Sequence, residues 1–210
     1  LFPYTTLFRS ILMPIFSLPS RYGIGSFSKS AYQFVDMLKK AGQKYWQILP
    51  LCPTSYGDSP YQSFSTYAGN PYFIDLDQLI EEKLLTRKEC QACDFGDDPQ
   101  DIDYGKLYEN RFKLLRKEYE RANVEEDQEF EAYRRENAWW LDDYALFMAV
   151  KDQFDGVAWN EWAEDIRLRW SNAMDYYRRE LYYEIEFYSY LQFVFMKQWK
   201  KLKNYANING

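Results

Sequence analysis

The chain has 210 residues, of which 47% are hydrophobic and 20% aromatic, and its formal net charge is −6. This length suits one domain or a piece of a larger one, with enough apolar residues to form a core. The negative charge argues against a nucleic-acid backbone as partner, and no apolar run approaches the length of a membrane span.

The first ten residues, LFPYTTLFRS, resemble a translated sequencing-library adapter. They lack the cationic start, long apolar centre and small-residue cleavage site of a signal peptide. We therefore treat residues 1–10 as an artefactual extension and exclude them from the fold prediction. The alternative is an ordinary N-terminal strand.

A strand–helix–strand unit is predicted next. Ile11 to Leu18 is an apolar run typical of a buried strand, and Tyr45 to Leu49 is a second one. Between them, apolar residues recur at helical spacing: Ala31, Phe34, Val35, Leu38 and Ala41. Ser28 or Ser30 can cap the start of this helix and Gly42 can end it. Two strands joined in this way normally form a parallel, right-handed unit.

The loop after the second strand, residues 50–76, is dense in Tyr, Ser, Gly, Asn and Pro. A buried strand that ends in such a loop is how a parallel α/β protein builds a ligand site. The tyrosines are Tyr56, Tyr61, Tyr67 and Tyr72. The short polar side chains are Ser59, Gln62, Ser63 and Asn70. Flat aromatic faces beside hydrogen-bonding groups suit a sugar, which has apolar ring faces and a hydroxyl rim.

The chain contains three cysteines and no histidine. Without histidine, Ser–His and Cys–His nucleophile pairs and histidine metal sites are excluded, so acid–base chemistry would rest on Asp and Glu. An odd cysteine count without a signal peptide is typical of a reducing compartment, and we predict a cytoplasmic location. Cys90 and Cys93 form a lone C-x-x-C pair, a weak redox or zinc signal that we interpret as structural.

From Asp77 the pattern is helical nearly to the C-terminus, and its apolar stripes are typical of core faces. Breaks are predicted near residues 96–99, 123–127, 137 and 155–156. The stripes include Leu107, Phe112, Leu115 and Tyr119, then Leu141, Tyr144, Ala145, Met148 and Ala149. A last helix is predicted from about Asn172 to Ala206, with room for a kink.

Four stretches closely resemble the amylomaltases, the 4-alpha-glucanotransferase family also called disproportionating enzymes. They are LMPIFSLPSRYGIGSF, KKAGQKYWQILPL, GDSPYQSFSTYAGNPYFIDL and EIEFYSYLQFVFMKQWKKLKNYAN, and the match covers residues 11–210. The resemblance implies an α/β fold in which residues 11–76 begin a (β/α)₈ TIM barrel, with two strands and one helix. Residues 77–210 would form a mostly α-helical insertion subdomain. A complete barrel needs about 250 residues, so we expect an N-terminal fragment whose barrel is incomplete before its third strand.

The resemblance also implies a retaining reaction that moves α-1,4-glucan segments between maltooligosaccharides. Such enzymes use a carboxylate nucleophile and a carboxylic acid about 5–5.5 Å apart. In the family both lie on later barrel strands, and no position here matches them, so we predict no catalytic residue, metal or cofactor in this chain. We interpret Asp58, in the loop, as a turn-bracing residue.

Sugar binding can be carried over residue by residue. Tyr61 matches the family tyrosine that packs on the sugar beside the cleaved bond, and Ser59 matches a polar contact in the same cleft. Tyr56 matches a tyrosine associated with a second glucan site outside the cleft. The alternative for each is a packed loop aromatic or a turn serine.

The expected partner is a maltooligosaccharide or starch-type glucan, without nucleic acid, membrane or obligate protein partner. Two other functions remain open: a non-catalytic glucan-binding or helical interaction module, and part of a hydrolase of the α-amylase clan.

Overall fold

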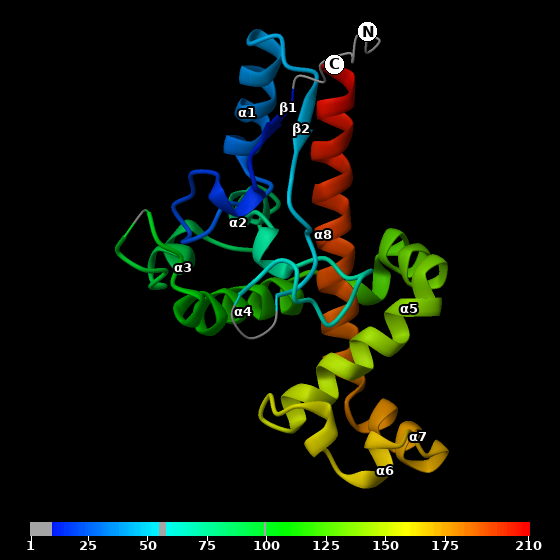
Figure 1. Cartoon of the computed structure of the whole chain (residues 1–210). Helices are drawn as coiled ribbons and strands as arrows, with labels where there is room; N and C mark the ends of the chain where they lie inside the picture. The colour runs from blue at the N-terminus through cyan, green and yellow to red at the C-terminus, as the bar shows by residue number, and fades with distance from the viewer. Residues whose placement is uncertain (1–9, 55–57, 99) are drawn as a thin grey trace, which may run out of the picture.

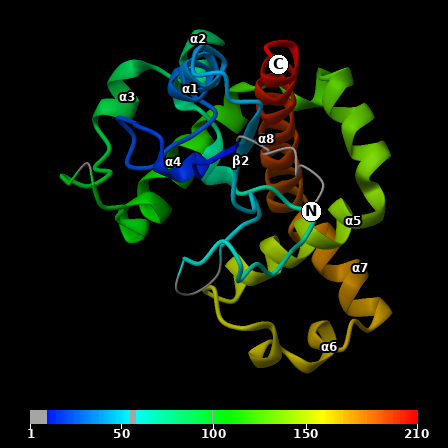
Figure 2. The same cartoon turned by 45° about the horizontal axis from the view of Figure 1, so that its top comes forward.

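The computed structural model describes residues 10–54, 58–98 and 100–210. A long C-terminal helix, α8 (Tyr182–Ile208), runs through the molecule, and both strands and α1 lie beside its C-terminal end (Figure 1). Figure 2 shows α8 between α1 to α4 on one side and α5 on the other. Residues 186–195 of α8 are all buried, which is typical of a helix that forms the centre of a core.

The remaining elements follow in chain order. They are β1 (Ser10–Leu12), η1 (Ile15–Ser17), α1 (Lys29–Lys40), β2 (Tyr45–Gln47), η2 (Pro71–Phe73), α2 (Leu76–Glu81), α3 (Arg87–Gln91), α4 (Tyr104–Arg121), η3 (Val124–Glu126), α5 (Gln128–Gln153), η4 (Trp159–Glu161), α6 (Glu164–Arg167) and α7 (Ser171–Glu180). The described part of the chain is therefore mostly helical, with one two-stranded sheet.

The predicted strand–helix–strand unit is present. β1 and β2 pair in parallel, with Ile11 opposite Trp46, and α1 lies between them in the chain. The α1 helix ends at Lys40, and Gly42, the predicted terminating residue, follows the C-cap Ala41 with a φ of +67°. The N–H of Gln43 donates to Leu38 O at 2.9 Å, the closing bond of a glycine-terminated helix. Ser28 occupies the N-cap position, but its side chain makes no capping hydrogen bond.

The predicted lengths and burial of the strands were wrong. β1 ends at Leu12, which is 52% exposed, and a 3₁₀ turn follows where a buried strand was expected. The last bond of the ladder runs from the N–H of Met13 to Gln47 O at 3.0 Å, and Pro14 then leads into the 3₁₀ turn. β2 likewise stops at Gln47 rather than at Leu49.

The helical prediction from Asp77 onward is confirmed in outline, with one error and one refinement. Asn137 does not break a helix but lies inside α5, where its amide donates to Tyr133 O at 2.8 Å and accepts from the Trp140 indole at 3.1 Å. These bonds satisfy a side chain that would otherwise compete with the helix. The predicted final helix is two helices, α7 and α8, separated by Leu181 alone.

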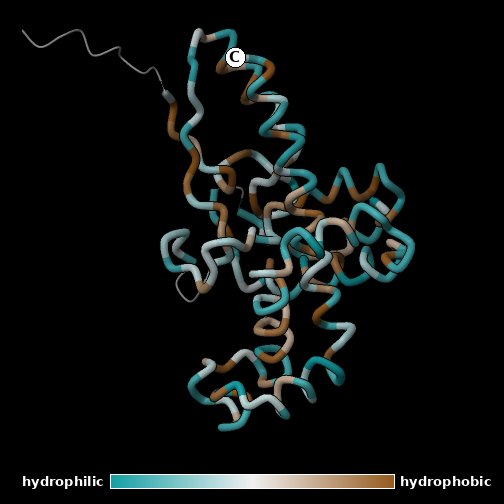
Figure 3. The backbone as a smooth tube through the Cα atoms, turned by 90° about the vertical axis from the view of Figure 1, so that its right-hand side faces the viewer, coloured by the Kyte–Doolittle hydropathy of each residue, from teal (hydrophilic) through white to brown (hydrophobic). Residues whose placement is uncertain are grey.

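The core has two parts. The larger surrounds α8 and includes residues of α1, α2, α4 and α5. The smaller joins the end of α5 to α6 and α7, which form a lobe at the bottom of Figures 1 and 3. Figure 3 shows hydrophobic and hydrophilic residues alternating along the helices, as expected for helices that bury one face.

Glu118 of α4 is a buried acid in the larger core. Its Oε1 accepts a hydrogen bond from the Tyr190 hydroxyl at 2.5 Å, and its Oε2 has no hydrogen-bond partner among the described residues. Burial, helped by the charge of Glu82, raises the pKa of Glu118 to about 8, although the bond from Tyr190 opposes this. Glu118 therefore keeps its proton in the folded protein at neutral pH.

This pKa predicts how stability depends on pH. Between the ordinary value of 4.5 and about 8, the folded protein holds a proton that the unfolded chain has released. The contribution of Glu118 to the free energy of unfolding should therefore fall as pH rises through this window. Urea unfolding at several pH values should show a weaker decline in Glu118→Gln. The exposed Glu120 of the same helix supplies the control, Glu120→Gln. Equal slopes for all three proteins would contradict the prediction.

Candidate functional site

The loop after β2 is fixed at its base by backbone and side-chain hydrogen bonds. The N–H of Asn70 donates to Leu51 O at 2.8 Å and closes the loop. The Asn70 side chain then accepts from the N–H of Tyr72 at 3.0 Å and caps η2, which has Pro71 in its first turn. Asp75 caps α2 by accepting from the N–H of Gln78 at 3.1 Å. These hydrogen bonds therefore fix the backbone where the loop ends and η2 and α2 begin.

Two of the three predicted site residues lie together on this loop. The N–H of Gln62 donates to Ser59 O at 3.1 Å, which makes a tight turn. The Oγ of Ser59 also accepts from the N–H of Tyr61 at 3.3 Å. This turn presents the Tyr61 side chain to solvent, where it is 72% exposed. The third, Tyr56, lies outside the described residues.

A cleft of about 510 Å³ opens between this loop, α4 and α5, with Tyr188 of α8 at its wall. Its aromatic lining consists of Phe64, Tyr72, Tyr104, Tyr108, Phe112, Tyr144 and Tyr188. Its charged lining consists of Asp58, Lys151, Asp152 and Asp155. Asp58 has a left-handed backbone, with φ of 54°, which Asp tolerates better than most residues. Its bracing role stays a prediction.

Several polar side chains in the cleft are hydrogen-bonded to one another, and burial favours their protonated forms. The Tyr188 hydroxyl donates to Oδ2 of Asp152, and Arg116 lies 3.9 Å from the same oxygen. Burial raises the pKa of Asp152 above its usual value, against the opposing effects of that hydrogen bond and of Arg116. Burial also raises the pKa of Tyr72, so its hydroxyl stays protonated. Phenol donors, carboxylate acceptors and aromatic faces together suit a polyhydroxyl ligand without net charge.

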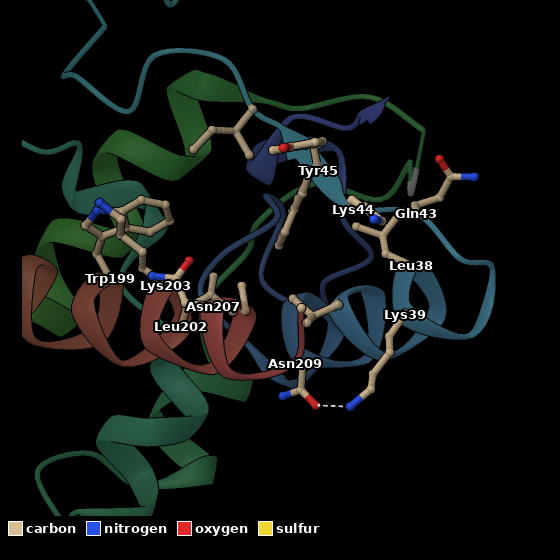
Figure 4. A pocket seen from close by; sticks show the side chains of 15 residues that line it. Leu38, Lys39, Gln43, Lys44, Tyr45, Trp199, Leu202, Lys203, Asn207 and Asn209 are labelled. Atoms are coloured by element: carbon tan, nitrogen blue, oxygen red, sulfur yellow. Dashed lines mark hydrogen bonds between the residues drawn. The ribbon is translucent and has the colours of Figure 1, made fainter. Parts of the chain in front are cut away.

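A second cavity, of about 380 Å³, lies between α1, β2 and the C-terminal end of α8 (Figure 4). At its edge the Lys39 ammonium donates to Asn209 Oδ1 at 3.0 Å. Among the described residues, no carboxylate side chain lines it, and none of its lining residues belongs to the loop of residues 50–76. The larger cleft, which joins the loop to three helices, is therefore the candidate site.

Comparison with known proteins agrees with this geometry. The 4-alpha-glucanotransferase family model matches residues 13–210. The 4-alpha-glucanotransferase of Clostridium butyricum is 51% identical over 195 residues, which are 93% of this chain and 40% of that protein. The solved structure of amylomaltase from Streptococcus agalactiae, in complex with acarbose, matches with a TM-score of 0.90 and 41% identity. That match covers 96% of this chain and 41% of the other.

The chain belongs to the 4-alpha-glucanotransferase family. The predicted resemblance is thus confirmed. This family member spans about 40% of the length of the curated relatives it matches, including the 4-alpha-glucanotransferase of Streptococcus pneumoniae, to which it is 49% identical over 201 residues. No helix in the described parts of the chain is long and apolar enough to cross a membrane.

None of the three cysteines of this chain is among the residues that line the cleft. All three are free thiols. Burial raises the pKa of Cys90 to about 11, so it stays protonated and is a poor nucleophile or metal ligand. Cys93 donates to Glu89 O at 3.5 Å. Within residues 10–54, 58–98 and 100–210, no group of three or more Cys, Asp or Glu side chains is placed to hold a metal ion.

Sequence reasoning found the loop but not the walls of the cleft. Tyr144 is predicted as a core stripe residue and Tyr188 lies within the last predicted helix; both are buried, yet they also line the cleft. Tyr104, Tyr108 and Asp152 were not singled out at all. The one sequence signal for these walls is the concentration of tyrosine on α4, α5 and α8. Helical periodicity shows that such residues share a face, but not whether that face packs in the core or lines a cleft.

Proposed function

We propose that this chain acts as part of a 4-alpha-glucanotransferase that transfers α-1,4-glucan segments between maltooligosaccharides by retaining double displacement. Its own contribution is to bind glucan on the loop after β2 and in the adjoining cleft, while the catalytic carboxylates come from outside these 210 residues. The observation that carries this proposal is the aromatic cleft, to which the loop after β2 contributes Asp58 and Phe64. Tyr61 lies between these two residues in sequence and is exposed, although neither it nor Ser59 is part of the cleft lining. The family match and the acarbose bound to the S. agalactiae amylomaltase support it.

We also propose that residues 11–76 begin the barrel, that residues 77–210 form a helical insertion subdomain, and that residues 1–10 are not part of the family sequence, although Ser10 begins β1. The parallel β1–α1–β2 unit and the similarity to amylomaltase support this division. The three free cysteines support a reducing compartment such as the cytoplasm. The family match argues against the alternative of a hydrolase of the same clan. A non-catalytic glucan-binding module remains the alternative function.

In this proposal Tyr61 supplies a stacking surface for a glucose ring. Its exposed side chain can be covered by one sugar face, and the Ser59 hydroxyl can still donate to a sugar oxygen. The role of Tyr56 at a second glucan site rests on the GDSPYQSF motif that follows it.

Tyr61→Ala should weaken binding of maltoheptaose by about tenfold, because covering one ring face is worth roughly 1–2 kcal/mol. Isothermal titration calorimetry on the whole chain measures this, and Tyr61→Phe should keep most of the affinity. The matched control is Tyr183→Ala, since Tyr183 is equally exposed, at 73%, but belongs to α8 rather than to the loop after β2. Equal losses at both positions, or no binding by the wild type, would overturn the proposed function.

A further inference from the structure

Two glutamines of α8 hold the backbone of the segment that ends the loop. The Gln192 Oε1 accepts from the N–H of Gly69 at 2.7 Å, and its Nε2 donates to Gly69 O at 2.9 Å. Gln198 makes the same pair of bonds with Asp75, at 2.7 and 3.3 Å. Both glutamines are buried, at 1% and 5% exposure. Each side-chain amide thus binds both polar backbone groups of one residue.

This pattern resembles the two-bond residue pair of an antiparallel ladder, with a side chain in place of the second strand. The contacted N–H and C=O groups would otherwise lose water without gaining a partner, which is costly in a buried place. The match of donor to acceptor also determines which end of each amide is oxygen and which is nitrogen. These are therefore specific clamps rather than chance contacts.

The two clamps differ in what they hold. Gly69 directly precedes Asn70, whose N–H closes the loop onto Leu51, so Gln192 acts at the loop base. Nε2 of Gln192 also lies 3.4 Å from the hydroxyl of Tyr144, which lines the cleft. Gln198 instead acts at Asp75, the N-cap of α2, six residues further along the chain.

We propose that Gln192 is a positioning residue for the glucan-binding loop, acting through Gly69 and Tyr144 rather than by touching sugar. It holds the loop base and the α5 wall in one geometry, so that the loop need not become ordered when glucan binds. Preorganisation of this kind raises affinity by removing an entropic cost of binding. Gln198 makes the same bonds but anchors α2, and it leaves glucan binding unaffected. This inference rests on the proposed function, because the ligand of the loop is the glucan named there.

The test compares Gln192→Leu with Gln198→Leu in the whole chain. Each change removes two clamp bonds from one buried backbone residue, so losses in melting temperature should be similar. Maltoheptaose affinity, by calorimetry, should fall about tenfold in Gln192→Leu and stay within about twofold of the wild type in Gln198→Leu. Amide hydrogen exchange over residues 58–68 should accelerate only in Gln192→Leu. Equal effects of the two variants on affinity and on loop exchange would overturn the inference.

Two further measurements keep this result interpretable. If Gln192→Leu does not fold, Gln192→Met replaces it, because the flexible thioether fills the same space and its sulfur can accept weakly from the N–H of Gly69 but cannot donate to Gly69 O. Its loop exchange and affinity should lie between those of wild type and a full loss. If the wild type binds no maltoheptaose, the proposed function is wrong, whereas the contrast in loop exchange still decides whether Gln192 positions the loop.

Discussion

Gly69→Ala is expected to lower the free energy of unfolding by about 3 kcal/mol, the upper end of the usual range for an overpacked core. A Cβ at this position would lie 2.2 Å from two carbons of the Phe195 ring. That ring is buried and packs edge-on against Phe27, with centroids 5.1 Å apart, so it has little room to turn away. The backbone cannot retreat either, because Gln192 holds it from the same helix.

Denaturant unfolding measures this loss, and Gly105→Ala is its matched control. Gly105 lies in α4, where an added Cβ would lie 3.4 Å from the Asp103 carboxylate, an ordinary contact distance. Alanine there should be neutral or stabilising by up to about 1 kcal/mol, through helix propensity. Combining Gly69→Ala with Phe195→Leu should recover part of the loss, since the clash is with the ring. Unchanged stability in Gly69→Ala alone would show that the loop is not pressed against α8.

The βαβ unit could be predicted because its signals are local. The apolar spacing of α1 and the glycine at its end are set by neighbours in sequence, and both were found correctly. Strand burial was not predictable in this way. Whether Leu12 is covered depends on which elements pack against it, and an apolar run carries no information about them.

The same holds for the candidate site: the part formed by neighbours in sequence could be predicted, and the part formed by tertiary packing could not. The composition of residues 50–76 was enough to predict a loop suited to sugar. The cleft, however, also needs α4, α5 and α8, which meet the loop only after folding. The hydrogen bonds between Gln192 and Gly69 could not be predicted, because nothing in the sequence around a helical glutamine indicates which distant residue it contacts. One signal was available: a polar amide within a stretch of α8 that is otherwise largely aromatic and aliphatic.

Arg111→Ala is the second change with a large expected effect, a loss of about 3 kcal/mol in the free energy of unfolding. Arg111 is fully buried in α4, where its guanidinium donates to Ile74 O and, at 3.4 Å, to Tyr22 O. It makes no ion pair in the described ranges, and burial lowers its pKa to about 10, against the opposing charge of Asp75. Because Ile74 follows η2 directly, this arginine also supports the turn that places Tyr72 in the cleft wall.

Opposing effects decide the size of this loss. Removing a buried, unpaired charge recovers several kcal/mol of desolvation cost. Alanine nevertheless leaves a large cavity, worth about 2–5 kcal/mol, and two buried carbonyls without donors, at about 1–3 kcal/mol each. Arg111→Met fills most of the cavity and still removes the charge, so it should lose less than half as much. Lys113→Ala, which removes an exposed charge from the same helix, is the control. If Arg111→Ala were as stable as Lys113→Ala, the recovered desolvation cost would outweigh the cavity and the lost hydrogen bonds, and Arg111 would not stabilise the cleft wall.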